Sequence, residues 1–362
     1  MDQVLYNEEW SSLFSNSMLQ GITCSASDHF PLVLTVDHKF THSRHFKFEN
    51  YCPKLDGYGE VVASACSLEP DTNDPFLRLH LKLSATAKAL KAWSAHATND
   101  IKLRAEIVNE LIFQLDKAMD SRQLTPQEHT FRKFLKVQCL GLAAIDRCRW
   151  RQRSCFLCLQ EGDCNSRFFH VKAAARRRKN FIPPLQLEDG NMAADQDQKI
   201  DTLWKHFNNL LGTVCRRHQT WNLDALRFDD AVDLTSLMAP ISEEEVKKAL
   251  FSIHPAEAPG PDGFTGLFFR TSKELIKHDL MLAIRKLETA NSQHLHKLNE
   301  ANMILIHKFN GANKASDFRP ISLIHSFSKI VSKVIATRLQ PLMPQLVLPC
   351  QNAFIKRAQQ PR

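Results

Sequence analysis

Two cations toward the C-terminal end of the sequence have the residue types and the spacing of a polyphosphate site. Lys308 ends an apolar, β-branched stretch that starts at Asn302, and Arg319 stands directly before Pro320 in the next short element. Lysine supplies an ammonium point charge and arginine a planar fork of donors, so the pair suits a chain of phosphates. The sequence therefore predicts a strand at 302–308 that positions Lys308, with Arg319 close to it.

A second group of cations lies between Arg147 and Asn180. This stretch of 34 residues holds ten Lys or Arg and two acids, whereas the rest of the chain carries 37 of each sign, so the net charge of +8 originates here. Arginines interleaved with aromatic residues allow phosphate pairing and base stacking, and RNA or DNA is the expected partner. The alternative is a solvated basic helix face. The candidate nucleic-acid-binding residues are Arg147, Arg149, Arg151, Arg153, Arg167, Arg176, Arg177, Arg178 and Lys179.

Cysteines in the same stretch invite a zinc interpretation. Cys155 and Cys158 have the spacing of a ligand pair, and Cys148, Cys164 and His170 lie nearby. A structural zinc site usually needs two well-spaced ligand pairs, and the remaining spacing fits no standard zinc module. We therefore expect no metal.

Composition bounds the class of protein. With 362 residues, 43% apolar and 24% charged, the chain has room for two or three domains and is neither disordered nor membrane-embedded. It lacks an apolar run of about 18 residues, so we expect no membrane span. Asp2, Glu8 and Glu9 stand where a signal peptide needs basic and apolar residues. We expect a nuclear or cytoplasmic protein, not a secreted one, with its ten cysteines reduced.

The elements that must position the basic residues read as long helices between residues 74 and 180. Thr125-Pro126-Gln127-Glu128 has the form of a capping box, and the short connections between helices predict antiparallel packing. The expected core stripes are Leu77, Leu81, Ala85 and Ala89; Ile107, Leu111 and Leu115; and Phe131, Phe134, Leu135, Leu142 and Ile145.

A mixed region follows. Phe181 to Leu187 reads as a strand with a turn at Asp189-Gly190, and Ser242 to Glu245 as a second capping box. The prolines and glycines of Ala258 to Phe264 predict a rigid loop. A helix is expected to present one face formed by Ile200, Leu203, Trp204, Phe207, Leu210 and Leu211. The fold class predicted is α+β, predominantly α.

Five motifs, which follow one another along the chain in the family's order, resemble parts of the polyprotein of plant non-LTR (LINE-type) retrotransposons. Ser27-Asp28-His29 resembles the C-terminal signature of the endonuclease/exonuclease/phosphatase family, and Ala258 to Phe264 resembles the opening of the reverse-transcriptase domain. The other motifs are Gly162 to His170, which resembles the linker, and Lys308 with Arg319 to Ser322 and Gln351 to Phe354, which resemble the fingers.

The resemblance implies four segments. Residues 1–38 would be the C-terminal remnant of the endonuclease domain, and 39–180 a long antiparallel, basic helical linker. Residues 181–300 would be a mixed α/β region entering the reverse-transcriptase domain, and 301–362 an incomplete, truncated fingers region. Without the palm against which the fingers strands normally pack, we expect Ile304 to be poorly covered, and Ile306 likewise.

The resemblance also implies roles for single residues. His29 would be the general base of the endonuclease and Asp28 the group that sets its tautomer, both vestigial here. Lys308 and Arg319 would hold the triphosphate of the incoming nucleotide. The parent activity needs Mg²⁺ held by palm carboxylates, but Asp317 is the only acid after residue 300, so no cofactor is expected in this fragment.

The sequence also departs from the family pattern. His307 stands where a proline is usual, Cys52 and Cys158 stand where tryptophan is expected, and Lys356-Arg357 lacks the glycine that should precede the arginine. The expectation is therefore a truncated, catalytically inactive RNA-directed DNA polymerase. The alternative is a nucleic-acid-binding module that uses the basic helix 147–179. The oligomeric state is not predicted.

Overall fold

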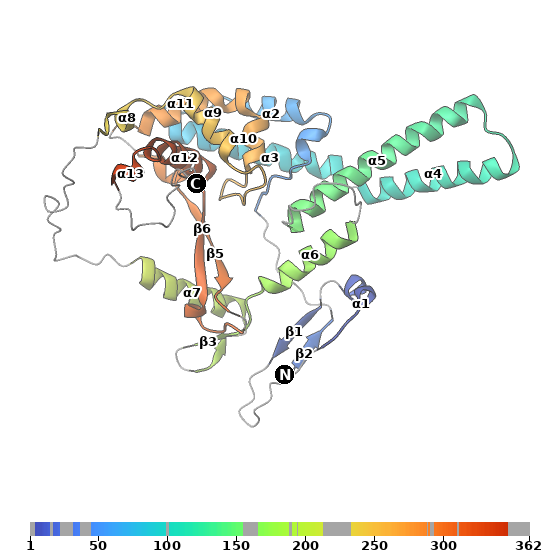
Figure 1. Cartoon of the computed structure of the whole chain (residues 1–362), viewed down its shortest axis with the longest axis horizontal. Coiled ribbons are helices and arrows are strands. Elements are labelled where there is room, and N and C mark those ends of the chain that lie inside the picture. The colour runs from blue at the N-terminus through green and yellow to red at the C-terminus, as the bar shows by residue number, and fades with distance from the viewer. Residues whose placement is uncertain are drawn as a thin grey trace, which may run out of the picture. The chain divides into compact units, whose positions relative to one another are not determined.

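The computed structural model describes residues 4–14, 17–21, 32–36, 45–98, 101–154, 166–187, 190–193, 195–212, 233–287, 289, 293–309 and 311–346. These residues are predominantly helical with small two-stranded sheets, which confirms the predicted fold class (Figure 1). None of their helices combines the length and the apolar character that a membrane crossing needs. The chain divides into two compact units. The first comprises 1–58, 90–194 and 306–317, and the second 59–89, 195–305 and 318–362.

The first unit begins with a short helix and a two-stranded sheet. Helix α1 spans Glu8–Leu13, and Asn7 caps it by accepting a hydrogen bond from the Trp10 N–H. Strands β1 (Met18–Gly21) and β2 (Leu32–Thr35) pair antiparallel. The 3-10 helix η1 (Cys52–Lys54) follows.

Helices α4 (Ile101–Ser121) and α5 (Pro126–Ser154) form an antiparallel hairpin. Asp116 pairs with Arg132 at 2.6 Å, and Cys139 Sγ donates to Asn109 Oδ1 at 3.3 Å. Asn109 precedes Asp116 by seven residues in α4, whereas its partner Cys139 follows Arg132 by seven residues in α5. The two helices therefore run in opposite directions. The predicted capping box opens α5: the Thr125 N–H donates to the Glu128 carboxylate at 2.8 Å, and the Glu128 N–H donates to Thr125 Oγ1 at 3.2 Å.

The buried faces of these helices differ from those expected from four-residue spacing. In α3 (Pro75–Thr98), Leu81 is 40% exposed, and the buried side chains follow one another at alternating steps of three and four. That alternation follows the helical repeat, whereas steps of four drift around the helix. The buried stripe of α3 is Phe76, Leu79, Leu83, Thr86 and Leu90.

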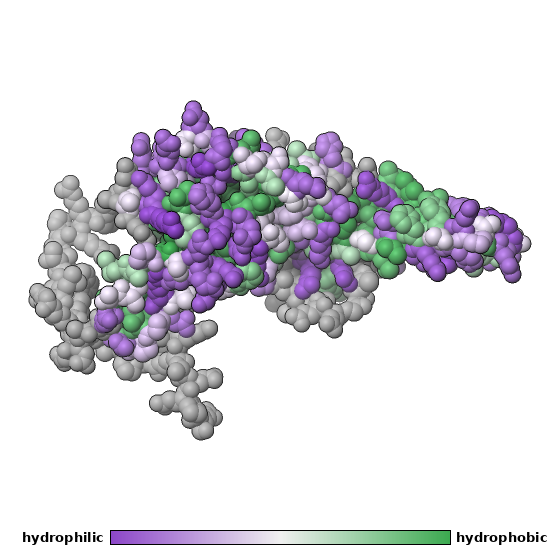
Figure 2. Space-filling view, turned by 90° about the horizontal axis from the view of Figure 1, so that it is seen from above, coloured by the Kyte–Doolittle hydropathy of each residue, from purple (hydrophilic) through white to green (hydrophobic). Residues whose placement is uncertain are grey.

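The α4–α5 hairpin shows the same difference. Ile107, Leu111, Phe131 and Phe134 were predicted to be core residues and are 50%, 39%, 45% and 55% exposed, whereas Leu135 is buried as predicted. Within the hairpin, α4 and α5 bury only the stripes that face one another, while the end of α5 also packs on the helix that follows it in the chain. The remaining apolar side chains form the hydrophobic surface visible on the hairpin in Figure 2.

The first unit also contains helix α6 (Ser166–Lys179) and a small β-hairpin. Helix α6 packs on α5. Strands β3 (Leu185–Gln186) and β4 (Met192–Ala193) pair antiparallel. The predicted turn contains Gly190 at φ 85°, a left-handed conformation that suits glycine, while Asp189 lies outside the described residues.

The second unit is a helical assembly around a cluster of phenylalanines. Phe264 stacks on Phe268 with ring centroids 3.9 Å apart and meets Phe269 edge-on, and Phe76 meets Phe327 edge-on at 6.2 Å. Its elements, besides the first part of α3, are α2 (Tyr58–Cys66), α7 (Gln196–Leu211), α8 (Thr235–Met238), α9 (Glu243–Ser252), α10 (Gly266–Thr271), α11 (Lys273–Leu287), η3 (Leu295–Leu298), α12 (Ser326–Leu339) and α13 (Met343–Leu346), with the strands β5 (Ala301–His307) and β6 (Phe318–Ile324).

Two predictions for this unit have different outcomes. The capping box of Ser242 and Glu245 is present at the start of α9. Helix α7 forms where its apolar pattern predicted it, but only Phe207 of the expected face is buried, whereas Trp204 is 62% exposed. The apolar periodicity thus predicted that α7 is a helix, but not that most of its apolar face is left uncovered.

Candidate nucleic-acid interface

The basic residues predicted to contact nucleic acid lie on α5 and α6, which contact one another through an aromatic pair. The rings of Trp150 and His170 have centroids 3.5 Å apart and planes tilted by 38°. The indole N–H of Trp150 also donates to Asp146 at 3.1 Å, which fixes the orientation of the indole ring. This pair joins the basic end of α5 to the helix that carries the second group of cations.

The four arginines of α5 are not equivalent. Arg147 is exposed, whereas Arg149 is half-buried and its Nε is enclosed. Arg153 pairs with Glu49 at 2.9 Å and lies over the Trp150 ring at 5.4 Å. Part of the predicted interface is therefore committed to packing within the unit, and Arg151 is half-buried as well.

A glutamine that sequence reasoning missed fixes the end of α5. The Gln152 side chain donates to the Phe48 carbonyl at 2.8 Å and accepts from the Asn50 N–H at 2.8 Å. Both partners lie about 100 residues earlier in the chain, so no local pattern indicates the contact. It orders the segment next to Arg151 and Arg153.

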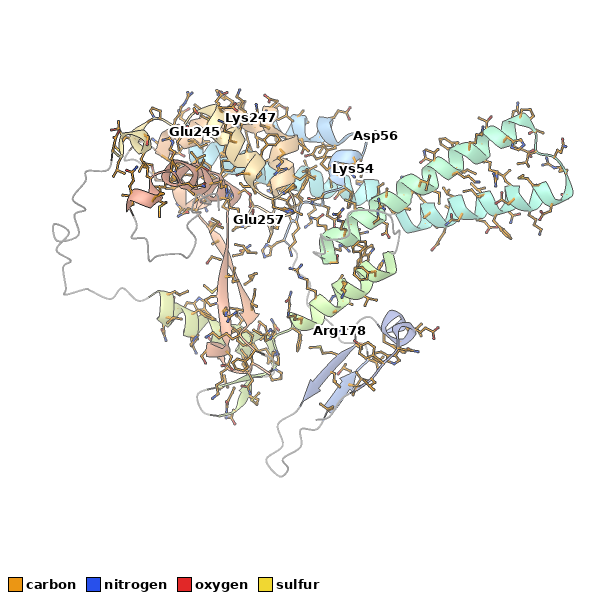
Figure 3. The ribbon with its side chains drawn as sticks, in the orientation of Figure 1. Lys54, Asp56, Arg178, Glu245, Lys247 and Glu257 are labelled. Carbon is orange, nitrogen blue, oxygen red and sulfur yellow. The ribbon has the colours of Figure 1, made fainter. Side chains whose placement is uncertain are left out.

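The last turn of α6 carries Arg176, Arg177, Arg178 and Lys179. Positive charge at this end complements the partial negative charge of the helix C-terminus. Consecutive helical residues point about 100° apart, so these four side chains surround the helix end rather than share one face. Figure 3 shows Arg178 at this end of α6. Arg167 lies in the first turn of the helix, and its side chain is outside the described residues.

Of the cysteines considered for zinc, the structure describes Cys148, and the expectation of no metal stays a prediction. Burial raises the pKa of the Cys148 thiol, whereas zinc binds the thiolate. The imidazole of His170 lies against the Trp150 ring, with the two planes tilted by 38°. Cys155, Cys158 and Cys164 lie outside the described residues.

Lys308 and Arg319 lie at the loop between β5 and β6, strands that form one two-stranded sheet. The Lys308 ammonium donates to the Ser316 carbonyl at 2.6 Å, and the Lys308 N–H donates to the Asp317 carbonyl at 2.9 Å. Lys308 therefore closes the loop, and Arg319 is exposed on β6. Their polyphosphate role remains a prediction.

The coverage of β5 matches the expectation. Ile304 is 40% exposed and Ile306 is 41% exposed within the described part of the chain, which confirms the prediction that both are poorly covered. The other motif residues, Asp28, His29 and Gln351 to Phe354, lie outside the described residues.

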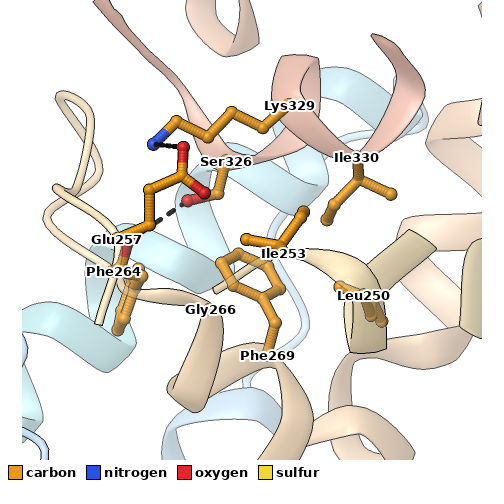
Figure 4. Close-up of a pocket in the computed structure, with 9 residues that line it drawn as sticks. All are labelled: Leu250, Ile253, Glu257, Phe264, Gly266, Phe269, Ser326, Lys329 and Ile330. Atoms are coloured by element: carbon orange, nitrogen blue, oxygen red, sulfur yellow. Dashed lines mark hydrogen bonds and ion pairs between the residues drawn. The ribbon is translucent and has the colours of Figure 1, made fainter. Parts of the chain in front are cut away.

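The loop from Ala258 to Phe264 docks on the start of α12. A Cβ at Gly260 would lie 2.2 Å from the Ile324 carbonyl oxygen, so only glycine fits this approach. Lys329 donates to the Ala258 carbonyl at 2.6 Å and pairs with Glu257 at 3.5 Å (Figure 4). The cavity drawn there holds about 10 Å³, the size of a single water, so it has no room for a larger ligand.

Three aromatic residues near the N-terminus were not singled out from the sequence. Tyr6, Trp10 and Phe14 lie in and beside α1, with successive ring centroids 5.6 Å and 5.2 Å apart. Their spacing of four residues is the signal that could have identified them, since it places side chains on one helical face.

Comparison with known proteins gives one informative similarity. No protein-family model matches the sequence. Over 212 residues the chain is 27% identical to the "Transposon TX1 uncharacterized 149 kDa protein" of Xenopus laevis. The alignment covers 56% of this chain and 15% of that protein, so the chain spans a small part of its relative. The similarity supports a transposon origin and is compatible with the resemblance to non-LTR retrotransposon proteins.

Proposed function

We propose that this chain derives from a non-LTR retrotransposon protein and that its α5–α6 section binds nucleic acid. The observation that carries the proposal is the Trp150–His170 contact, which holds the two groups of cations together in the stretch that contains the whole charge surplus. Phosphate neutralisation by lysine and arginine dominates affinity for nucleic acid.

The contacts on α5 define which residues carry the proposal. Because Arg153 is paired with Glu49 and Arg149 is enclosed, the α5 arginines contribute less than their number suggests. The four cations in the last turn of α6 are the principal phosphate contacts in this proposal. These cations surround the end of the helix, so a flexible nucleic-acid strand can wrap around it and contact all four. Binding does not require the cations to form one flat face.

Nucleotide polymerisation by this chain alone is not part of the proposal. Two-metal phosphoryl transfer needs several carboxylates, and Asp317 is the only acid between residues 301 and 362. Its carboxylate accepts the N–H groups of Asn313 at 3.3 Å and Lys314 at 3.0 Å, so it caps its own loop. The residues of this segment therefore do not fit a pair of Mg²⁺ ions. Lys308 and Arg319 are proposed as contacts for a nucleotide triphosphate, inherited from a reverse-transcriptase ancestor.

A charge-matched comparison tests the binding proposal. One variant replaces Arg176, Arg177, Arg178 and Lys179 by glutamine, and the control replaces four exposed cations of the α4–α5 hairpin. Fluorescence anisotropy with single-stranded RNA should show that the first variant flattens the plot of log affinity against log salt by about 0.7 per lost phosphate contact. The control should keep the slope of the unsubstituted chain. Equal losses in both variants would contradict the proposal, because total charge would then explain the binding. The control positions are Arg104, Lys117, Lys133 and Lys136.

A further inference from the structure

The first unit contains a cavity between its N-terminal segment and the end of α6. Its volume is about 770 Å³, within the range of pockets that enclose small ligands. Among the lining residues that the structure describes, two are cations and none is acidic. The lining residues are Val4, Leu5, Tyr6, Asn7, Trp10, Ser17, Met18, Leu19, Leu34, Arg178 and Lys179.

Aromatic rings form one side of this cavity. Tyr6 is 57% exposed, and its ring is tilted by 43° from that of Trp10. Trp10 is in turn tilted by 48° from Phe14. Rings tilted in this way do not cover one another's faces as a parallel stack would, so an additional ring can lie against them.

The cations of the cavity come from the last turn of α6. Lys179 is exposed, and Arg178 is half-buried. Figure 3 shows Arg178 at the end of the helix. The described part of the lining is therefore net positive, because Arg178 and Lys179 are its charged residues. A guanidinium and an ammonium beside aromatic rings are the combination that binds a nucleotide, with the phosphate on the cations and the base on the rings.

We propose that this cavity binds an unpaired nucleotide of single-stranded nucleic acid, with its base against Tyr6 and Trp10 and its phosphate on Arg178 and Lys179. The inference rests on the proposed function and deepens it by naming the strand state. In a duplex, both faces of each base are covered by neighbouring base pairs. Only an unpaired base can therefore stack on these rings.

The test compares single-stranded and duplex oligonucleotides of about 12 nucleotides, a length within the range bound by single-strand-binding domains. The full chain is titrated by fluorescence anisotropy, and Tyr6 and Trp10 are replaced together by leucine, which keeps apolar surface but removes the rings. Single-strand affinity should fall about 10-fold or more, while duplex affinity and the salt slope stay unchanged. Replacing both residues by phenylalanine should restore single-strand affinity.

Two further variants complete the test. Trp204→Leu, on the exposed face of α7 in the second unit, is the matched control and should bind as the unsubstituted chain does. Replacing Arg178 and Lys179 by glutamine should lower the salt slope for single strands by about 1.4, at about 0.7 per phosphate contact. The aromatic variant should thus lower the single-strand affinity without changing the salt slope, whereas the charged variant should lower the salt slope.

The outcomes separate this inference from the proposed function. If the leucine variant binds single strands as the unsubstituted chain does, while the α6 charge variant loses affinity, the stacking site is wrong and the basic interface stands. An equal loss for single strands and duplex would also overturn the stacking site. If the unsubstituted chain binds neither oligonucleotide, the proposed function is wrong, and this inference with it.

Discussion

The side chains of Trp150 and His170 connect α5 to α6 at a centroid separation of 3.5 Å. The pair stands between the arginines at the end of α5 and the cations at the end of α6. Neither residue is one of the lysines or arginines of the candidate interface. We therefore assign the pair the role of holding the two charged segments together.

Trp150→Ala should therefore destabilise the first unit. Loss of the ring contact with His170, and of its cation–π contact with Arg153, should lower the free energy of unfolding by about 1–2 kcal/mol. Trp150→Phe should lose less of the free energy of unfolding than Trp150→Ala, because phenylalanine keeps an aromatic ring. Trp204→Ala, which truncates a side chain that is 62% exposed, should change stability by less than about 0.5 kcal/mol. Urea unfolding followed by circular dichroism provides the comparison, and equal effects of the two alanine variants would contradict the packing role.

A buried ion pair in the second unit provides the next prediction. Asp279 is 5% exposed and accepts hydrogen bonds from Arg78 at 2.7 Å and Lys82 at 2.9 Å. Asp279→Asn leaves Lys82 buried without this counter-charge and should cost about 3 kcal/mol. Glu274→Gln removes an exposed pair with Lys273 and should leave the unfolding free energy unchanged. A result in which the two variants unfold at the same urea concentration would rule out this role for Asp279.

Stability should also depend on pH through Glu245. Its carboxylate accepts a two-pronged contact from Arg338 at 2.6 and 2.8 Å, which lowers the pKa of Glu245 from 4.5 to about 2. A lowered pKa in the folded state means that the stabilisation is present above pH 4.5 and is lost as the pH falls toward 2. Because Glu245 is about one-third exposed, we expect only about 1 kcal/mol.

The measurement for this prediction is urea unfolding at a series of pH values between 7 and 2. In the Arg338→Gln variant, the free energy of unfolding should depend less on pH between 4.5 and 2 than it does in the unsubstituted chain. Asp279 contributes to the same acid-side loss, because burial raises its pKa but the hydrogen bonds from Lys82 and Arg78 outweigh burial and leave that pKa lowered. An unchanged curve in the Arg338→Gln variant would show that the contact does not hold the Glu245 pKa down.

Gly260 and Gly141 should respond in opposite directions to alanine. A Cβ at Gly260 meets the Ile324 backbone oxygen, so Gly260→Ala should cost about 2–3 kcal/mol by overpacking. Gly141 lies in the interior of α5 with no atom within 4 Å of its Cβ position, so Gly141→Ala should gain about 0.5–1 kcal/mol. Thermal unfolding monitors both, and a stabilising Gly260→Ala would refute the docking of the loop on α12.

The features that the sequence predicted correctly are local. A capping box connects residues three apart, so Thr125 with Glu128 and Ser242 with Glu245 are visible in the printed sequence. The hairpin of α4 and α5 follows from two long helices with a short connection. These features depend on neighbours in the chain and need no knowledge of the tertiary contacts.

The features that the sequence did not predict depend on distant partners. Leu81 and Ile107 were placed in the core because they belong to apolar stripes with four-residue spacing, but both side chains are exposed. Gln152 meets a backbone segment about 100 residues away, and Trp150 meets His170 across two helices. For the candidate interface, the composition identified the stretch, but only the contacts show which arginines are committed to packing.

Photo-crosslinking tests the central claim most directly. The full chain is mixed with a single-stranded RNA of about 12 nucleotides that carries a photoreactive uridine, and the crosslinked peptides are sequenced. The account predicts crosslinks within residues 147–179, above all in α6, with further crosslinks at Tyr6 and Trp10 if the cavity binds an unpaired base. Crosslinks confined to the second unit, or their absence at low salt, would contradict nucleic-acid binding by the α5–α6 section.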